Sequence, residues 1–140
     1  DVSAIMAPQQ LLSDVPNGQA QLRARTLLTI AWSRIGKVAY WRHFDDPDII
    51  RGYKEADEAF KLANDPLVKF SASYAKAYSL AFRPNQDTEA MLKLLTEARH
   101  WYRKIPGADN QSWAYMLQND TLKGYIKTDP AFQSLLASSS

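Results

Sequence analysis

The dipeptide Asp-Pro occurs three times in this chain, and a helical pattern of apolar residues follows it each time. The pairs are Asp46-Pro47, Asp65-Pro66 and Asp129-Pro130. An Asp side chain accepts hydrogen bonds from the free N–H groups of a first helical turn, and Pro fits the next position, where no donor is needed. Each pair therefore predicts the start of a helix.

Apolar residues at helical spacing extend this prediction to most of the chain. After the first Asp-Pro pair, for example, the apolar stripe continues through Ile49, Tyr53, Ala56, Phe60 and Ala63. Five principal helices are expected, at about 18–42, 47–63, 66–82, 86–104 and 110–126, and a short closing helix at about 130–136. The links are short, which favours antiparallel neighbours. The sequence predicts an all-α fold of antiparallel helical hairpins.

The length of the chain and the residues near its N-terminus indicate its domain organisation. A chain of 140 residues is expected to form one domain. Pro8, Pro16 and Asn17-Gly18 predict an irregular N-terminal arm over 1–17, so the helical-hairpin domain is expected at 18–140. Asp1 in place of an initiator Met indicates a processed protein or a trimmed piece, and leaves both an exported and a cytoplasmic location open.

Composition argues against several classes of function. The chain has no cysteine, which excludes disulfides, thiolate catalysis and zinc–thiolate sites. With a net charge of only +2, the chain has no strong positive electrostatic field that would attract nucleic acid or acidic membranes. No apolar segment reaches the length of a membrane helix, so a soluble protein is expected. No Gly-rich phosphate loop or nucleophile motif occurs, and neither an enzyme nor a cofactor is predicted.

Two segments resemble each other. Glu55-Ala56 and Glu97-Ala98 are each followed, four positions after the alanine, by an aromatic residue, then by a basic residue and later by a proline. This pattern resembles the second helix of a tetratricopeptide repeat, although its spacing along this chain is longer than in that family. The chain end, from Asp129-Pro130 onward, is also similar to the closing segment of such proteins. The resemblance covers about 19–136 and implies a tetratricopeptide-like array or right-handed α-α superhelix that serves as a scaffold for protein or peptide partners.

The resemblance also implies where a partner would bind, because the first helix of each hairpin lines the concave groove in such arrays. Polar and basic side chains share one face on each of the two helices concerned. They are Arg23, Thr26, Ser33 and Lys37 on the first helix and Lys69, Ser73 and Lys76 on the third. We expect a non-catalytic scaffold or adaptor whose partner is a protein or peptide, and the lysines of such a groove would favour an acidic partner. A solvated helix face is the simpler interpretation of the same pattern.

Two other classes of function stay open. Four Trp and seven Tyr residues could line a pocket between helices, as in a small-molecule-binding or enzymatic helical domain. The clusters at 40–43 and 99–104 combine basic and aromatic residues, as RNA-binding surfaces do. Both clusters also lie where helices are expected to end, and the helix dipole favours cations there.

Two histidines could be considered as metal ligands. His43 lies close to Asp45, Asp46 and Asp48, although helix capping accounts for those acids equally well. Glu97 and His100 have the spacing used in di-iron bundles, but the second pair that such a centre needs is missing. No metal site is predicted.

Overall fold

The computed structural model describes residues 19–41, 46–118 and 122–137 of the chain, and within these ranges it contains helices and no strand. The elements in chain order are α2 (Ala20–Trp41), α3 (Pro47–Leu62), α4 (Pro66–Ala81), α5 (Thr88–Tyr102), α6 (Asn110–Gln118), α7 (Lys123–Thr128), α8 (Pro130–Gln133) and the 3-10 helix η1 (Ser134–Leu136). The all-α prediction is confirmed.

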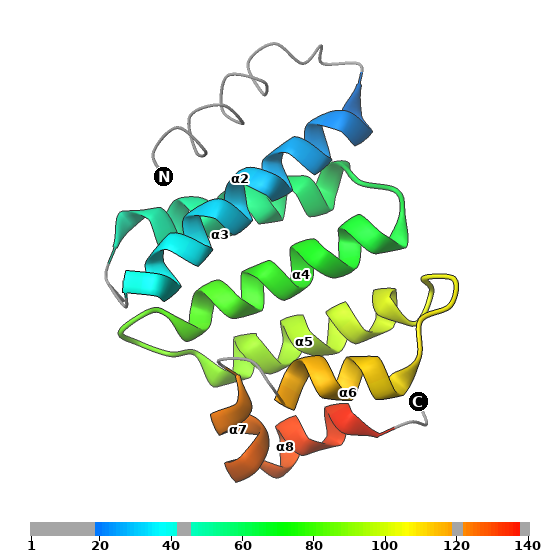
Figure 1. Cartoon of the computed structure of the whole chain (residues 1–140). Helices are drawn as coiled ribbons and strands as arrows, with labels where there is room; N and C mark the ends of the chain where they lie inside the picture. Colours follow the sequence, from blue (N-terminus) through cyan, green and yellow to red (C-terminus); the bar gives the residue numbers. More distant parts are fainter. Residues whose placement is uncertain (1–18, 42–45, 119–121, 138–140) are drawn as a thin grey trace.

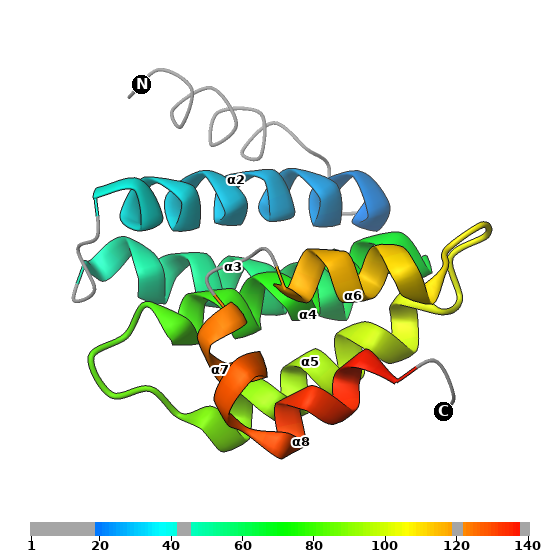
Figure 2. The same cartoon turned by 60° about the horizontal axis from the view of Figure 1, so that its bottom comes forward.

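From α2 to α5, helices that are consecutive in the sequence pack side by side (Figure 1). The main contacts join α2 to α3, α3 to α4 and α4 to α5, and α2 also touches α4. The elements after α5 cover the end of the array, where η1 contacts both α5 and α6 (Figures 1 and 2). The chain is therefore an array of antiparallel helical hairpins, as the short links predicted.

Two of the three Asp-Pro pairs cap their helices in the way the sequence predicts. The Asp46 carboxylate accepts a hydrogen bond from the N–H of Asp48 at 2.9 Å, and the Asp129 carboxylate accepts one from Ala131 at 2.9 Å. Asp65 is different, because its side chain makes no capping hydrogen bond. One of its carboxylate oxygens lies 3.8 Å from the Arg25 guanidinium instead. The start of α4 therefore relies on its proline and not on the aspartate side chain.

The stretch predicted as one helix over 110–126 is two helices, α6 and α7. The carboxylate of Asp109, not the side chain of Asn110, accepts the hydrogen bond from Ser112 N at 2.7 Å. Asn110 is the first residue of α6, and its side chain donates to the carbonyl of Leu136 at 3.0 Å. The predicted N-terminal arm at 1–17 lies outside the described residues.

Two apolar clusters form the core, and α4 contributes to both. The first joins α2, α3 and α4, and the second joins α4 to α5, α6, α8 and η1. Ala56 and Ala98, the alanines of the repeated pattern, are fully buried, one in each cluster. At Gly52 a Cβ would lie 3.1 Å from the Ile35 side chain, so α2 and α3 approach closely there.

Candidate functional site

All four basic residues of the predicted groove contact α3. On α2, Arg23 lies 3.6 Å from the Glu58 carboxylate and Lys37 lies 2.6 Å from that of Asp48. The two hydroxyls predicted with them bond to their own helix. Thr26 donates to the carbonyl of Leu22 and Ser33 donates to the carbonyl of Thr29, each at 2.9 Å.

The predicted residues of α4 lie on the face of that helix that packs inside the array. Lys69 Nζ donates to the carbonyl of Phe60 at 3.0 Å and lies 4.2 Å from the centre of the Phe60 ring. Lys76 is buried, and its ammonium group is 2.8 Å from the Asp57 carboxylate. Ser73 is fully buried, and its hydroxyl has no hydrogen-bond partner among the described residues. The structure thus brings the predicted cations together around α3 and uses them to hold it between α2 and α4. Partner binding through them stays a prediction.

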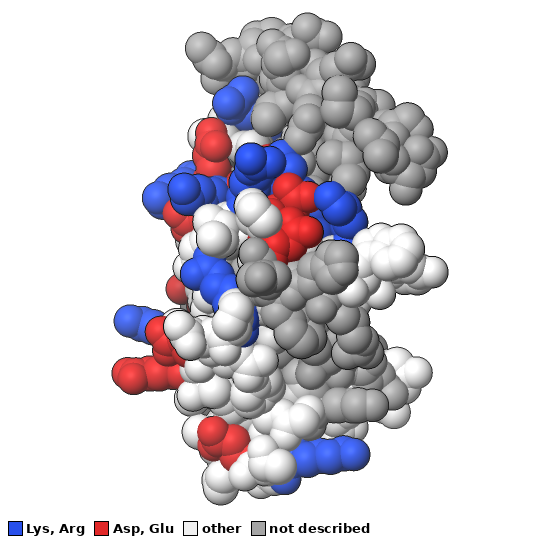
Figure 3. Space-filling model, turned by 90° about the vertical axis from the view of Figure 1, so that its left-hand side faces the viewer, with Lys and Arg blue, Asp and Glu red and all other residues white. Residues whose placement is uncertain are grey.

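A buried charge network joins α2 to α3. Arg34 is only 9% exposed, and it forms a two-pronged pair with Glu55, with N···O distances of 2.6 and 3.2 Å. Arg34 also donates to Asp48 at 3.2 Å, and Asp48 in turn binds Lys37. Figure 3 shows basic and acidic side chains next to one another at the end of the array where α2 ends and α3 begins. Their charges are largely balanced within the chain.

The pKa values of Arg34, Asp48 and Lys37 are each shifted in the direction that favours the charged form. Burial alone would lower the pKa of Arg34, but the hydrogen bonds and negative charges of Glu55 and Asp48 outweigh it and raise the pKa. The hydrogen bond from Lys37 holds the pKa of Asp48 below its ordinary value of 3.8, against the opposite effect of burial. The same bond raises the pKa of Lys37. Fixed, paired charges of this kind stabilise a hairpin and do not exchange protons near neutral pH.

A different surface, between α2 and α4, is hollowed and mainly apolar. We call it the α2/α4 groove. It has a volume of about 370 Å³ and is lined by Arg25, Leu28, Thr29, Trp32, Leu67, Val68 and Ser71. The indole N–H of Trp32 donates to the hydroxyl of Ser71 at 3.0 Å, which ties the two walls together. Leu67 is 56% exposed, so a large apolar side chain of this groove faces solvent.

A series of aromatic rings that begins at Trp32, a residue of the groove, links four helices. Neighbouring ring centres are 5.2 to 6.4 Å apart. The order is Trp32 of α2, then Tyr78, Tyr74 and Phe70 of α4, then Tyr102 of α5 and Trp113 of α6. Tyr74 and Trp113 are buried among other rings, so these aromatic residues fill the interior of the array. Such ring pairs are favourable beyond the area they bury, so they help to hold the four helices together.

The aromatic residues of the RNA hypothesis lie in unlike environments. Trp41 is 62% exposed and has Tyr40 beside it, with ring centres 5.0 Å apart. Trp101 is half-buried, with its ring against Phe60 and with Lys104 above it at 4.9 Å. The exposed pair is therefore at the end of α2, while Trp101 is already stacked within the chain.

The metal hypotheses find no support in the part of the chain that the structure covers. Among the described residues, no group of three or more His, Asp or Glu side chains is placed to hold a metal ion. His43 and Asp45 lie outside those residues. None of the described helices has both the length and the apolar character that crossing a membrane would require.

Comparison of the chain with protein-family models, with curated proteins and with solved structures finds no match. The functional assignment therefore depends on the surfaces of the molecule itself. Sequence reasoning placed the binding residues on the polar faces of the helices. The α2/α4 groove was not predicted; the sequence shows only that Leu67 lies one helical turn before the small Ser71, and the exposure of Leu67 is visible only in the structure.

Proposed function

We propose that this chain is a non-catalytic binding module that holds a segment of a partner protein in the α2/α4 groove. The observation that carries the proposal is the exposed Leu67 beside an apolar hollow whose two walls are joined by the Trp32–Ser71 hydrogen bond. An apolar side chain of a partner would remove Leu67 and the hollow from water, and such burial contributes about 25 cal/mol per Å².

The edge of the groove indicates the chemistry of the partner. Arg25 lines the groove, its side chain is 67% exposed, and its ion pair with Asp65 is long, at 3.8 Å. An exposed arginine of this kind can bind a second carboxylate. The expected partner segment therefore carries an apolar anchor residue with an acidic residue close to it.

The arrangement of the helices supports the proposal in a second way. The chain is an array of antiparallel hairpins with α2 and α4 as neighbours, and these are the first helices of two successive hairpins. In the tetratricopeptide family, which the sequence resembles, such helices line the surface that binds peptides. The groove has the place in the array that the resemblance implies for a partner, although its residues are not those that the polar pattern indicated.

A peptide selection with matched variants tests this function. Peptides displayed on phage are selected on the immobilised wild-type chain, and each enriched peptide is measured by fluorescence anisotropy. Leu67→Glu is expected to weaken binding at least tenfold, because it places a charge in the apolar hollow. Ile50→Glu is the control, since Ile50 is a similarly exposed apolar residue on α3. Peptides that bind Leu67→Glu and Ile50→Glu equally well, or the absence of any enriched peptide, would refute the proposal.

A further inference from the structure

The hydroxyl of Ser71 does not follow the usual pattern of a hydroxyl inside a helix. Such hydroxyls commonly donate to a carbonyl of the preceding turn, and Thr26, Thr29 and Thr96 each donate to the carbonyl four residues earlier, at 2.8 to 3.0 Å. Ser71 accepts a hydrogen bond from the indole N–H of Trp32 at 3.0 Å, and no described residue accepts the proton of its own hydroxyl. The α2/α4 groove therefore contains a hydroxyl whose oxygen is held by Trp32 and whose proton is not used within the described part of the chain.

Ser71 and Arg25 are the two side-chain donors that the groove offers to a partner. Among the other polar residues that line it, Thr29 donates to its own helix and Trp32 donates to Ser71. The side chain of Arg25 is 67% exposed, and its ion pair with Asp65 is long, at 3.8 Å. The remaining lining residues are apolar. A partner in the groove therefore meets one charged donor, one neutral donor and apolar surface.

The two donors are well separated along the groove. Arg25 and Trp32 lie two turns apart on α2, which corresponds to about 10 Å along the helix axis. Ser71 lies beside Trp32, at the other end of their hydrogen bond. An extended chain advances about 3.3 Å per residue, so about three residues span this distance. The pair of donors therefore fits a carboxylate and a neutral acceptor about three residues apart in an extended segment.

The neutral acceptor that a peptide offers at every residue is its main-chain carbonyl. Inside an α-helix each carbonyl already accepts a hydrogen bond from the N–H four residues later. In an extended segment, or at the last turn of a helix, the carbonyl is not used in this way. A carbonyl that meets Ser71 in the middle of a binding segment therefore indicates an extended backbone.

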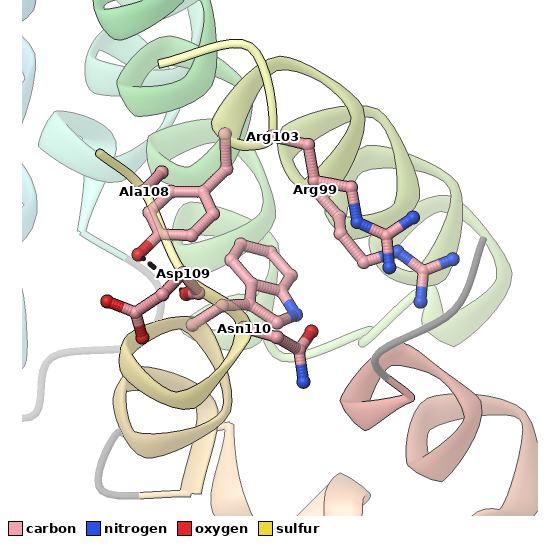
Figure 4. A pocket seen from close by; sticks show the side chains of 7 residues that line it. Arg99, Arg103, Ala108, Asp109 and Asn110 are labelled. Atoms are coloured by element: carbon pink, nitrogen blue, oxygen red, sulfur yellow. Dashed lines mark hydrogen bonds between the residues drawn. The ribbon is translucent and has the colours of Figure 1, made fainter. Parts of the chain in front are cut away.

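The chain binds its own closing segment through contacts of this kind, in a hollow of about 220 Å³ between α5 and α6 (Figure 4). Arg99, Asn110 and Trp113 line this hollow, and they donate to the carbonyls of residues 134–136 at 2.8 to 3.1 Å. These residues form η1, a 3-10 helix of three residues, so its last carbonyls have no N–H partner within a helix. Side-chain donors of this array thus bind main-chain carbonyls of a segment that is not an α-helix.

We infer that the partner of the α2/α4 groove binds as an extended segment, with one of its main-chain carbonyls accepting a hydrogen bond from Ser71. A carboxylate of the segment lies about three residues away, at Arg25, and an apolar side chain between these points packs against Leu67. This binding mode rests on the proposed function, since it concerns the same groove. Ser71 then determines specificity for an extended backbone, because an amphipathic helix brings apolar side chains to a groove but no free carbonyl at its middle.

Two hydroxyl variants test the role of Ser71. Each enriched peptide that loses binding in Leu67→Glu is measured by fluorescence anisotropy with the wild type, Ser71→Ala and Thr29→Val, and circular dichroism checks that the variants are folded. Ser71→Ala is expected to weaken binding about fivefold, the effect of one neutral hydrogen bond. Thr29→Val removes a hydroxyl of the same groove whose proton is already used within α2, and it is expected to change the affinity less than about twofold. Equal affinities of the two variants would overturn this role of Ser71.

Ser71→Ala also removes the acceptor of the Trp32 N–H, so a second measurement separates direct contact from support of the groove wall. Each amide of the peptide is replaced in turn by an ester, whose carbonyl is a weaker acceptor. At one position the ester is expected to weaken binding to the wild type about threefold and to leave binding to Ser71→Ala unchanged. If every ester weakens binding to both proteins by the same factor, Ser71 only supports the wall and does not bind the partner.

A proline scan of the same peptide distinguishes an extended segment from a helix. Proline breaks the interior of a helix, but it is compatible with an extended backbone. At one or more positions other than the apolar anchor and the acidic residue, proline is expected to keep the affinity within about threefold of the parent peptide. Loss of binding at every such position indicates a helical partner and contradicts the extended mode.

The same measurements separate the extended mode from the proposed function. Peptides that depend on Leu67 but bind Ser71→Ala and Thr29→Val equally well support the groove as the binding site and refute the extended mode. If no peptide depends on Leu67, both are refuted. Peptides that depend on Leu67, lose affinity in Ser71→Ala and tolerate proline support both.

Discussion

Replacing Arg34 by methionine is expected to cost about 3 kcal/mol of folding free energy. Arg34 makes three charge-assisted hydrogen bonds, two to Glu55 and one to Asp48, and its side chain is only 11% exposed. Methionine retains most of the apolar stem but none of the donors. The variant therefore leaves the carboxylate of Glu55, whose side chain is 18% exposed, without its partner.

The magnitude follows from this geometry. Each hydrogen bond to a charged group contributes about 1.5–3 kcal/mol, but the three bonds share one guanidinium and do not add. Breaking a buried ion pair by removing one partner costs about 3–5 kcal/mol. Glu55 can turn toward water, and Asp48 still has Lys37, so the lower end of that range applies. For a chain of this size, about 3 kcal/mol corresponds to a fall in melting temperature of roughly 10 °C.

The assay is urea unfolding at pH 7, followed by far-ultraviolet circular dichroism and extrapolated linearly to water. Arg23→Met is the control, because Arg23 lies on the same helix and pairs with Glu58 at 3.6 Å in a more exposed position. It should cost less than about 1 kcal/mol. The double variant Arg34→Met/Glu55→Met should regain part of the loss, since it removes the unpaired carboxylate. If Arg34→Met is as stable as Arg23→Met, the network does not hold the α2–α3 hairpin as argued.

Three further predictions concern the packing, the acid response and the helix starts. Ala56→Leu and Ala98→Leu should each lower the free energy of unfolding by about 1–3 kcal/mol, because both alanines are fully buried and a larger side chain forces strain; unchanged melting temperatures would contradict this. The hydrogen bond from Lys37 lowers the pKa of Asp48 from 3.8, and for Asp57 burial raises the pKa but the hydrogen bonds from Lys76 and Lys61 outweigh it and lower the pKa from 3.8. The contribution of both carboxylates to stability is therefore present above about pH 3.8 and is lost as the pH falls through their lower pKa values in the folded state. Unfolding measured from pH 6 to pH 2 should show that loss, with a shallower slope in Asp57→Asn. Asp87→Ala should cost about 1 kcal/mol because the Asp87 carboxylate caps α5, whereas Asp65→Ala should cost less, because Asp65 makes no capping bond; equal losses would show that the cap is not the cause.

The sequence predicts the helices well because their signals are local. Asp46-Pro47 and Asp129-Pro130 start helices as expected, and the short links between helices lead to antiparallel neighbours. The division of 110–126 into α6 and α7 was not predicted, since the apolar spacing through Trp113, Leu117 and Leu122 is compatible with one helix. The spacing of the apolar residues alone does not show that the helix ends within this range.

The candidate site is harder to predict because it depends on which neighbour covers each face of a helix. Lys69 and Lys76 look like a solvated face in the sequence, but in the array they point toward α3, where Asp57 and the Phe60 carbonyl receive them. A single sequence does not say which acid will lie opposite which base.

The central claim is that a partner segment binds in the α2/α4 groove, and the indole N–H of Trp32 tests it most directly. The chain has four Trp residues, so its indole signals in a proton–nitrogen correlation spectrum are few and can be assigned. Titration with an enriched peptide is predicted to shift the Trp32 signal, because its hydrogen bond to Ser71 spans the groove, and to leave the signal of buried Trp113 in place. Binding that shifts the signals of Trp41 or Trp101 and leaves that of Trp32 unchanged would contradict the account.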